Sequence, residues 1–497
     1  MGLFSKNKPP RPERVPTDTV VPLSFTDDLP LLRAISVHVT CRFDNILDTK
    51  VLRLSLERLL QLDGWRRLGA RLRLNDNGKL EYHVPVEYDA KRPGAEFTVA
   101  SYSMGIDDHP LGAKFPQASS QPALVGCPTE LLPLCLGPHS PRQIEDWLYS
   151  DRPQLAIHVV SFNDATLVTV TWIHTLADIM WLAGFFQAWT AVMSGREEEV
   201  PEFQGIGETP LQYLGKDTAG EPYANDRFLL QSLGLLCFAL WYIFERIWYP
   251  REKERIMCIP ERFVEQLRAN SLDELKQQNK EGAPFLSESD VLLAWWTRAQ
   301  TRALDPFPNR LTTLLNVFDV RGIALPESTQ SNTAFVTNAV QGSFTFLPTE
   351  QIINQPISAL ASQIRRSLVQ HRTKPQVEAC YARCKTHSKN ILDTPIYGAS
   401  NGLMLGCSNW NRSRLFDVDF SAAVIMKETR WTDCTHGHGR PSYINPGYLT
   451  LGLSSRNTGR IVGKDASGNW WLSYSLRTGA WPAIEEDLKA LGATDNK

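Results

Sequence analysis

The pattern of apolar and polar residues predicts a hairpin and a helix in close succession in the first half of the chain. Residues 165–173 are rich in β-branched and apolar residues, as is typical of a strand, and the dipeptide Asn-Asp at 163–164 predicts a turn before them. From 179 to 193 the apolar residues recur at helical spacing instead. His174 and Asp178 therefore lie where a strand ends and a helix begins. Further strands are predicted at 97–102 and 154–162.

The second half shows the same mixture of patterns. It has predicted helices at 259–271, 286–304 and 348–370, and predicted strands at 311–320 and 401–410. A chain of 497 residues is too long for one ordinary core, so we expect two layered α/β domains. The polar, Gly- and Pro-rich stretch 194–227 is typical of a linker between them. The predicted division is a disordered basic tail at 1–16, a first domain at 17–215, a crossover at 216–257 and a second domain at 258–497.

An almost uncharged stretch follows the predicted linker. Residues 228–244 number 17 and would form a helix about 25 Å long, short of a bilayer core of about 30 Å. A buried or amphipathic crossover helix is therefore favoured over a helix seated in a membrane. The basic residues Arg251, Lys253 and Arg255 leave peripheral membrane contact through 228–255 open.

Composition narrows the class of protein only a little. A net charge of -2 and a pI near 6.6 give no indication of nucleic-acid binding. The nine cysteines are scattered, and the first residues lack the apolar segment of a secretory signal. We therefore expect reduced thiols and a cytoplasmic protein, with contact to an internal membrane left open.

His174 and Asp178 form the sequence H-x-x-x-D and have two interpretations. Taken alone, they are an interior histidine and a carboxylate at a helix N-terminus. In a cleft, however, a neutral imidazole can accept a proton from a hydroxyl group near neutral pH. A buried aspartate close by would then need a cationic partner, because an unpaired buried carboxylate is costly.

The rest of the chain favours the catalytic interpretation. Six more segments resemble segments of one enzyme superfamily, and they follow one another in the order found in that superfamily. The chain resembles the BAHD acyltransferases of plants and fungi and their chloramphenicol-acetyltransferase relatives over roughly residues 20–480, closest to the fungal secondary-metabolite O-acetyltransferase branch. One motif departs from the plant pattern Asp-Phe-Gly-Trp-Gly, since Asp419 and Phe420 are followed by Ser-Ala-Ala. The segments are "PLSFTDD" (22–28), "WRRLGARLRLNDNGKLEYHVP" (65–85), "SESDVLLAWWTRA" (287–299), "NVFDVRG" (316–322), "TAFVTNAV" (333–340) and "SNWNRSRLFDVDF" (408–420).

The resemblance implies a fold and a reaction. The fold would be two chloramphenicol-acetyltransferase-like domains, with mixed sheets, flanking helices and an active-site channel between them. The reaction would be transfer of an acyl group, most simply acetyl from acetyl-CoA, to a hydroxyl of a terpenoid, alkaloid or polyketide, without an acyl-enzyme. Acyl-CoA would be a co-substrate, with no permanently bound cofactor and no metal, and the protein would be a monomer.

The resemblance also implies roles for particular residues. His174 would be the general base, and an oxyanion formed in the transition state would need hydrogen-bond donors. The other implied residues are Asp178 as a brace of the histidine loop, Arg321 as its ionic partner, Ser408 and Trp410 as oxyanion donors, and Asn338 and Asp419 as structural residues.

Several alternatives stay open at this point. "GASNG" (398–402) fits the hydrolase motif G-x-S-x-G, but the apolar segment after Ser400 reads as a strand rather than the helix that this motif requires. A non-catalytic scaffold of the same fold is a second alternative. A carrier-dependent condensation enzyme is a third, although Ile173 stands where such enzymes usually have a second histidine. Incomplete metal-site patterns occur at "HGHG" (436–439) and at Cys380, Cys384 and His387.

Overall fold

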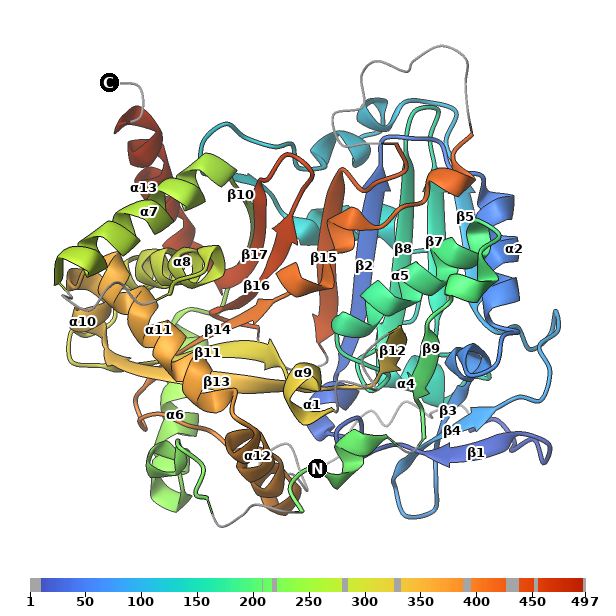
Figure 1. Cartoon of the computed structure of the whole chain (residues 1–497), viewed down its shortest axis with the longest axis horizontal. Coiled ribbons are helices and arrows are strands. Elements are labelled where there is room, and N and C mark those ends of the chain that lie inside the picture. The colour runs from blue at the N-terminus through green and yellow to red at the C-terminus, as the bar shows by residue number, and fades with distance from the viewer. Residues whose placement is uncertain are drawn as a thin grey trace.

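Two large sheets with helices packed against them make up the protein (Figure 1). The computed structural model describes residues 10–207, 209–216, 221–278, 285–325, 332–387, 395–425, 438–450 and 455–494. The first sheet has five strands in the order β15-β2-β8-β7-β5, and the second has seven in the order β13-β11-β14-β16-β17-β10-β6.

The first sheet carries the H-x-x-x-D motif at one end of its central strand. Every residue of β8 is buried, which explains its nearly continuous run of apolar and threonine side chains. A tight turn at 163–164 connects β7 to β8, and α5 lies across one face of the sheet. The elements are β2 (Ile35–Phe43), β5 (Glu96–Ser101), β7 (Ala156–Ser161), β8 (Thr166–Ile173), β15 (Tyr443–Thr450), α2 (Thr49–Leu59) and α5 (Met180–Met193).

The second sheet packs against helices of the second half around a separate core. Its strands are β6 (Ala123–Gly126), β10 (Glu252–Ile259), β11 (Leu311–Asp319), β13 (Val340–Pro348), β14 (Leu403–Asn409), β16 (Thr458–Lys464) and β17 (Trp470–Arg477). The helices are α7 (Glu261–Gln278), α8 (Glu288–Leu304), α10 (Thr349–Asn354), α11 (Ile357–His371), α12 (Lys374–His387) and α13 (Trp481–Thr494).

Smaller elements connect and flank the two sheets. One small sheet has the order β1-β4-β3, and β9 pairs with β12 in another. These strands are β1 (Thr19–Pro22), β3 (Arg71–Leu74), β4 (Leu80–Val84), β9 (Glu202–Gly205) and β12 (Thr333–Val336). The remaining helices are α1 (Pro30–Arg33), α3 (Leu132–Cys135), α4 (Ile144–Leu148), α6 (Ser232–Trp248) and α9 (Arg321–Ala324).

The two large sheets exchange one strand each. β15 comes late in the chain, yet it pairs with β2 over eight residues at the edge of the first sheet. Figure 1 shows it in orange-red beside the blue β2. Conversely, β6 comes early and pairs with β10 at the edge of the second sheet. A cut of the chain at the predicted crossover would therefore not separate the sheets.

Most predicted elements are present, with two local differences. The helix predicted at 348–370 is broken into α10 and α11. Pro356 lies at the break, where its ring disfavours helical backbone at the preceding residue and it cannot donate a backbone hydrogen bond. The predicted linker 194–227 also contains β9, which pairs with β12 from the second half.

The apolar stretch 228–244 does form a helix. We expected it to be buried or amphipathic, and the buried form is wrong. α6 has no buried residue, and Leu233 and Ile247 are 71% and 73% exposed. Among the described residues, no helix combines the length and the apolar character that crossing a bilayer demands.

Candidate active site

His174 lies immediately after β8, on a loop that the fold holds firmly. Its backbone N–H donates to the carbonyl of Ile35 on β2 at 2.9 Å. Further along the loop, the Tyr82 hydroxyl donates to the carbonyl of Thr175, and the Trp172 indole donates to that of Ala177. The imidazole is only partly exposed. The loop therefore presents the ring in a defined position before α5 begins.

Asn338 fixes the tautomer of His174. Asn338 Nδ2 lies 2.9 Å from both the His174 carbonyl and Asp27 Oδ1, and both of these atoms only accept hydrogen bonds. This sets the orientation of the amide, so Asn338 Oδ1 is the atom 3.0 Å from His174 Nδ1. An amide oxygen accepts, and Nδ1 must therefore carry the hydrogen. The lone pair of the neutral ring is left on Nε2, which can act as a base.

The surroundings of His174 favour its neutral form. Burial lowers the pKa of His174 below its ordinary value of 6.5, while the charge of Asp178 and the hydrogen bonds with the backbone and Asn338 raise it in part. At neutral pH the imidazole is therefore unprotonated and can accept a proton.

The Asp178 carboxylate is directed toward the second half of the protein and connects that half to the histidine loop. Arg321 Nη2 lies 3.1 Å from both carboxylate oxygens of Asp178, so one nitrogen, rather than the whole guanidinium fork, makes the contact. Asp178 also accepts hydrogen bonds from the backbone N–H groups of Met180 at 2.9 Å and Ala339 at 2.8 Å. These contacts tie the histidine loop to α9 and to the segment between β12 and β13.

Arg321 is held from a second side as well. Its Nη1 donates to Asp319 at 2.8 Å, and its Nη2 donates to the carbonyl of Thr337 at 2.8 Å. Both Asp178 and Arg321 are almost completely buried, with 3% and 8% of their surfaces exposed. The structure thus brings together four of the sequence-predicted residues: His174, Asp178, Arg321 and Asn338.

Asp27 is a member of this network that sequence reasoning missed. Its Oδ1 accepts from the backbone N–H of Asn338 at 2.7 Å, and its Oδ2 accepts from the hydroxyls of Ser24 at 2.6 Å and Thr337 at 3.0 Å. Burial raises the pKa of Asp27 from 3.8 to about 6, although these hydrogen bonds lower it in part. The segment 22–28 is one of those that resemble the superfamily, but nothing in its sequence distinguishes Asp27 from Asp28, which pairs with Arg33 instead.

We expect Asp27 to make the stability of the protein depend on pH. A carboxyl group whose pKa is raised on folding stabilises the folded state at low pH, and this contribution is lost as the pH rises through the folded pKa. A shift from 3.8 to about 6 corresponds to about 3 kcal/mol, lost between these two pH values. Asp27→Asn removes the ionisation but keeps the shape of the side chain.

The measurement is urea unfolding of the wild-type and Asp27→Asn proteins at about pH 4 and about pH 7. The stability of the wild type relative to the variant should fall by about 2–3 kcal/mol over this interval. Parallel pH dependences of the two proteins would contradict the buried, titrating carboxyl.

Ser408 and Trp410 lie at the end of β14 and contact each other. The Trp410 indole N–H donates to Ser408 Oγ at 3.0 Å, so this donor is already engaged. Trp410 is buried, whereas Ser408 is partly exposed. Asp419 is exposed and accepts from the backbone N–H of Ser421 in a turn. Among the described residues, no hydrogen bond joins any of these three side chains to His174.

The hydrolase interpretation of Ser400 is wrong. Residues 403–409 form the strand β14, so no helix follows the serine as a nucleophile elbow requires. His436, the histidine of that alternative, lies outside the described residues, as does part of the "HGHG" segment. Cys380 and Cys384 lie one turn apart on α12 and hydrogen-bond to each other.

Comparison with known proteins agrees with this fold. Residues 11–423 match the family described as the Transferase family. The chain is 41% identical to the acetyltransferase adrJ of Penicillium rubens, over 99% of this chain and 100% of that protein. It is also 36% identical to a Penicillium decumbens protein named transcriptional regulator calD, over 98% and 99% of the two chains.

The fold is shared with a solved structure of a fungal protein. The structure of TRI101 from F. sporotrichioides, complexed with coenzyme A and T-2, superimposes with a TM-score of 0.66 at 13% identity, covering 95% of this chain and 99% of that one. The predicted fold, two chloramphenicol-acetyltransferase-like domains with mixed sheets and flanking helices, is thereby confirmed. With relatives this similar over their whole length, the chain belongs to the Transferase family and is an acyltransferase.

Proposed function

We propose that this protein is an acyl-CoA-dependent O-acyltransferase that acylates a hydroxyl group of a fungal secondary metabolite. The observation that carries the proposal is the contact of His174 Nδ1 with Asn338 Oδ1, which leaves Nε2 as a base. We take acetyl-CoA as the donor, because adrJ is named an acetyltransferase and TRI101 was solved with coenzyme A. A terpenoid, alkaloid or polyketide alcohol is the proposed acceptor.

The reaction would proceed in one ternary complex. His174 Nε2 takes the proton of the acceptor hydroxyl as its oxygen attacks the thioester carbonyl carbon. The tetrahedral intermediate collapses, the carbon–sulfur bond breaks, and the leaving thiolate receives the proton from the imidazolium. The products are the ester and free CoA, and no acyl group is attached to the protein.

Ser408 is the proposed donor to the oxyanion. Because the Trp410 N–H is directed at Ser408 Oγ, the serine hydroxyl keeps its own hydrogen to donate elsewhere. A hydrogen bond accepted by a hydroxyl also strengthens the one it donates. Trp410 would thus act through Ser408 rather than touch the oxyanion itself.

The remaining predicted residues have positioning roles in this proposal. Asp178 and Arg321 would hold the histidine loop against the second half, and Asn338 would hold the ring and its tautomer. Asp419 would shape the turn at 419–421.

Two rival functions use the same fold. The name of calD makes a non-catalytic binding protein worth testing, but a binding protein has no need of a fixed tautomer and a base of lowered pKa. A condensation-type enzyme would take its acyl group from a carrier protein and would show no turnover with free acyl-CoA.

The test is release of CoA thiol when the purified protein is mixed with acetyl-CoA and a panel of terpenoid, alkaloid and polyketide alcohols. We expect release that requires an alcohol, together with an ester whose mass has increased by one acetyl group. Release at equal rates with and without alcohol would indicate thioester hydrolysis and contradict the proposal. Ester formed only from a carrier-bound acyl group would favour the condensation enzyme.

A further inference from the structure

The outward face of α6 is apolar along its whole length. The exposed residues between Gln231 and Pro250 include no charged side chain. Trp248, for example, is 67% exposed, and its ring stacks on that of Phe244 rather than on the body of the protein. The exposed large apolar and aromatic residues of this surface are Leu233, Leu236, Leu240, Tyr242, Ile243, Phe244, Ile247, Trp248 and Tyr249, which we call the α6 face.

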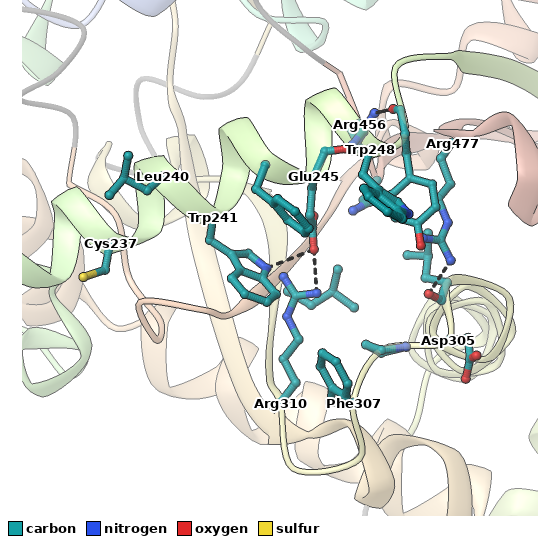
Figure 2. Close-up of a pocket in the computed structure, with 16 residues that line it drawn as sticks. Cys237, Leu240, Trp241, Glu245, Trp248, Asp305, Phe307, Arg310, Arg456 and Arg477 are labelled. Atoms are coloured by element: carbon teal, nitrogen blue, oxygen red, sulfur yellow. Dashed lines mark hydrogen bonds and ion pairs between the residues drawn. The ribbon is translucent and has the colours of Figure 1, made fainter.

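Polar contacts, in contrast, hold the inward side of the helix. Figure 2 shows Glu245 directed toward Trp241 and Arg310, which donate to its carboxylate at 3.1 Å and 2.6 Å. Arg456 Nη1 donates to the carbonyl of Glu245 at 3.0 Å, and Arg456 also contacts the carbonyl of Tyr249. Charged groups therefore hold the side of α6 that faces the protein, and the outward side is apolar. An ordinary surface helix has the opposite arrangement, because it buries its apolar side.

A groove beneath α6 enlarges this apolar surface. It has a volume of about 680 Å³ and lies between the helix and the segment after α8. Phe307 on its far wall is 71% exposed. A contiguous apolar surface of this kind is uncommon on a soluble monomer and marks a contact site.

The exposed charges nearest to the two ends of α6 in the sequence are basic, whereas one exposed carboxylate, Asp305, lines the groove. Arg227 precedes the helix and Arg251 follows it, and both are exposed. The charged residues within the last turn are paired, Glu245 with Arg310 on the inward side and Arg246, whose side chain is 39% exposed, with Glu252. Aromatic residues at the end of an apolar helix, with basic residues beyond it, are typical of a segment at the boundary between lipid headgroups and acyl chains.

We propose that the α6 face docks onto a membrane surface that contains anionic phospholipids, with the helix lying in the plane of the interface. Arg227 and Arg251 would meet the phosphate and carboxylate groups of the headgroups. A second copy of this chain fits the surface less well, because pairing two α6 helices in either direction brings arginines of the two copies together. This docking is independent of the acyltransferase proposal and does not rest on it.

The experiment is flotation of the full-length protein with vesicles of phosphatidylcholine alone and of phosphatidylcholine with phosphatidylserine. The test variant is Leu233→Gln/Ile243→Gln/Ile247→Gln, whose three side chains point away from the groove lining. The control is Leu54→Gln/Val86→Gln/Val369→Gln, three apolar residues elsewhere that are each more than half exposed. Circular dichroism and sedimentation velocity establish that each protein is folded and give its oligomeric state.

We expect the wild type and the control to float with the anionic vesicles, and the α6 variant to show a partition coefficient lower by at least about tenfold. Arg251→Gln should weaken binding to anionic vesicles about fivefold and leave binding to neutral ones unchanged. Wild-type protein that stays in solution, or an α6 variant that floats as well as the wild type, would overturn the proposal. A dimer that the α6 substitutions dissociate, without vesicle binding, would assign the surface to a second copy instead.

Discussion

Replacing His174 with alanine is expected to lower kcat by about 10²–10⁴-fold, because the acceptor hydroxyl then loses its general base. The ring sits on a loop held by backbone hydrogen bonds, so its removal should leave the fold intact. Binding of acyl-CoA should change little, since the base acts in the chemical step. A measurement of kcat by thiol release, with the thermal midpoint recorded in parallel, separates loss of chemistry from loss of folding.

His139→Ala is the control for this prediction, because it removes an imidazole that is exposed and has no hydrogen bond to the His174 network among those of the described residues. The pH profile gives a second check. Because burial lowers the pKa of His174 below 6.5, activity should fall on the acid side only below that pH. Alcohol-dependent turnover that survives in His174→Ala would show that another group takes the proton.

Removing one partner of the buried Asp178–Arg321 pair is expected to reduce the free energy of unfolding by about 3–5 kcal/mol. In Asp178→Ala, the guanidinium of Arg321 keeps Asp319 but loses the second carboxylate, and the N–H groups of Met180 and Ala339 lose their acceptor. A buried guanidinium left with one of its two carboxylates and two unsatisfied N–H donors together account for the size of the effect. Urea unfolding followed by tryptophan fluorescence measures it.

Two further variants separate charge from hydrogen bonding at this site. Asp178→Asn keeps an oxygen acceptor and should cost less than Asp178→Ala. In the double variant Asp178→Asn/Arg321→Gln both charges are gone, so the loss should be smaller than the sum of the two single losses. A loss below about 1 kcal/mol in Asp178→Ala would mean that the pair is not the brace described above.

Local patterns predicted the parts of the site that depend on neighbouring residues. The hairpin of β7 and β8 follows from two apolar runs separated by a turn dipeptide, and this placed His174 at a strand end. The start of α8 likewise follows from Ser287 and Asp290, whose side chains cap the helix reciprocally. The pairing of Asp178 with Arg321, 143 residues later, came only from the resemblance.

Other features depend on contacts that no local pattern contains. Asp27 reaches the site through Asn338, 311 residues away, and its neighbour Asp28 has the same local sequence character. The exposure of α6 was also not predictable, since an apolar stretch of this length is normally buried in a protein of this composition. The charge of its one internal carboxylate, Glu245, is paired with Arg310, which lies 65 residues further along the chain.

The exchange of β15 and β6 between the sheets has a consequence for protein synthesis. The first sheet needs residues 443–450 to cover the edge of β2, so it cannot be completed until nearly the whole chain has left the ribosome. Until then the nascent polypeptide presents β2, a strand of nine residues, as an open edge on which other chains can pair. A premature stop codon before residue 443 would therefore do more than delete the second half: it would leave the first half with an aggregation-prone edge, and the cell would have to rely on chaperones or proteases to deal with it.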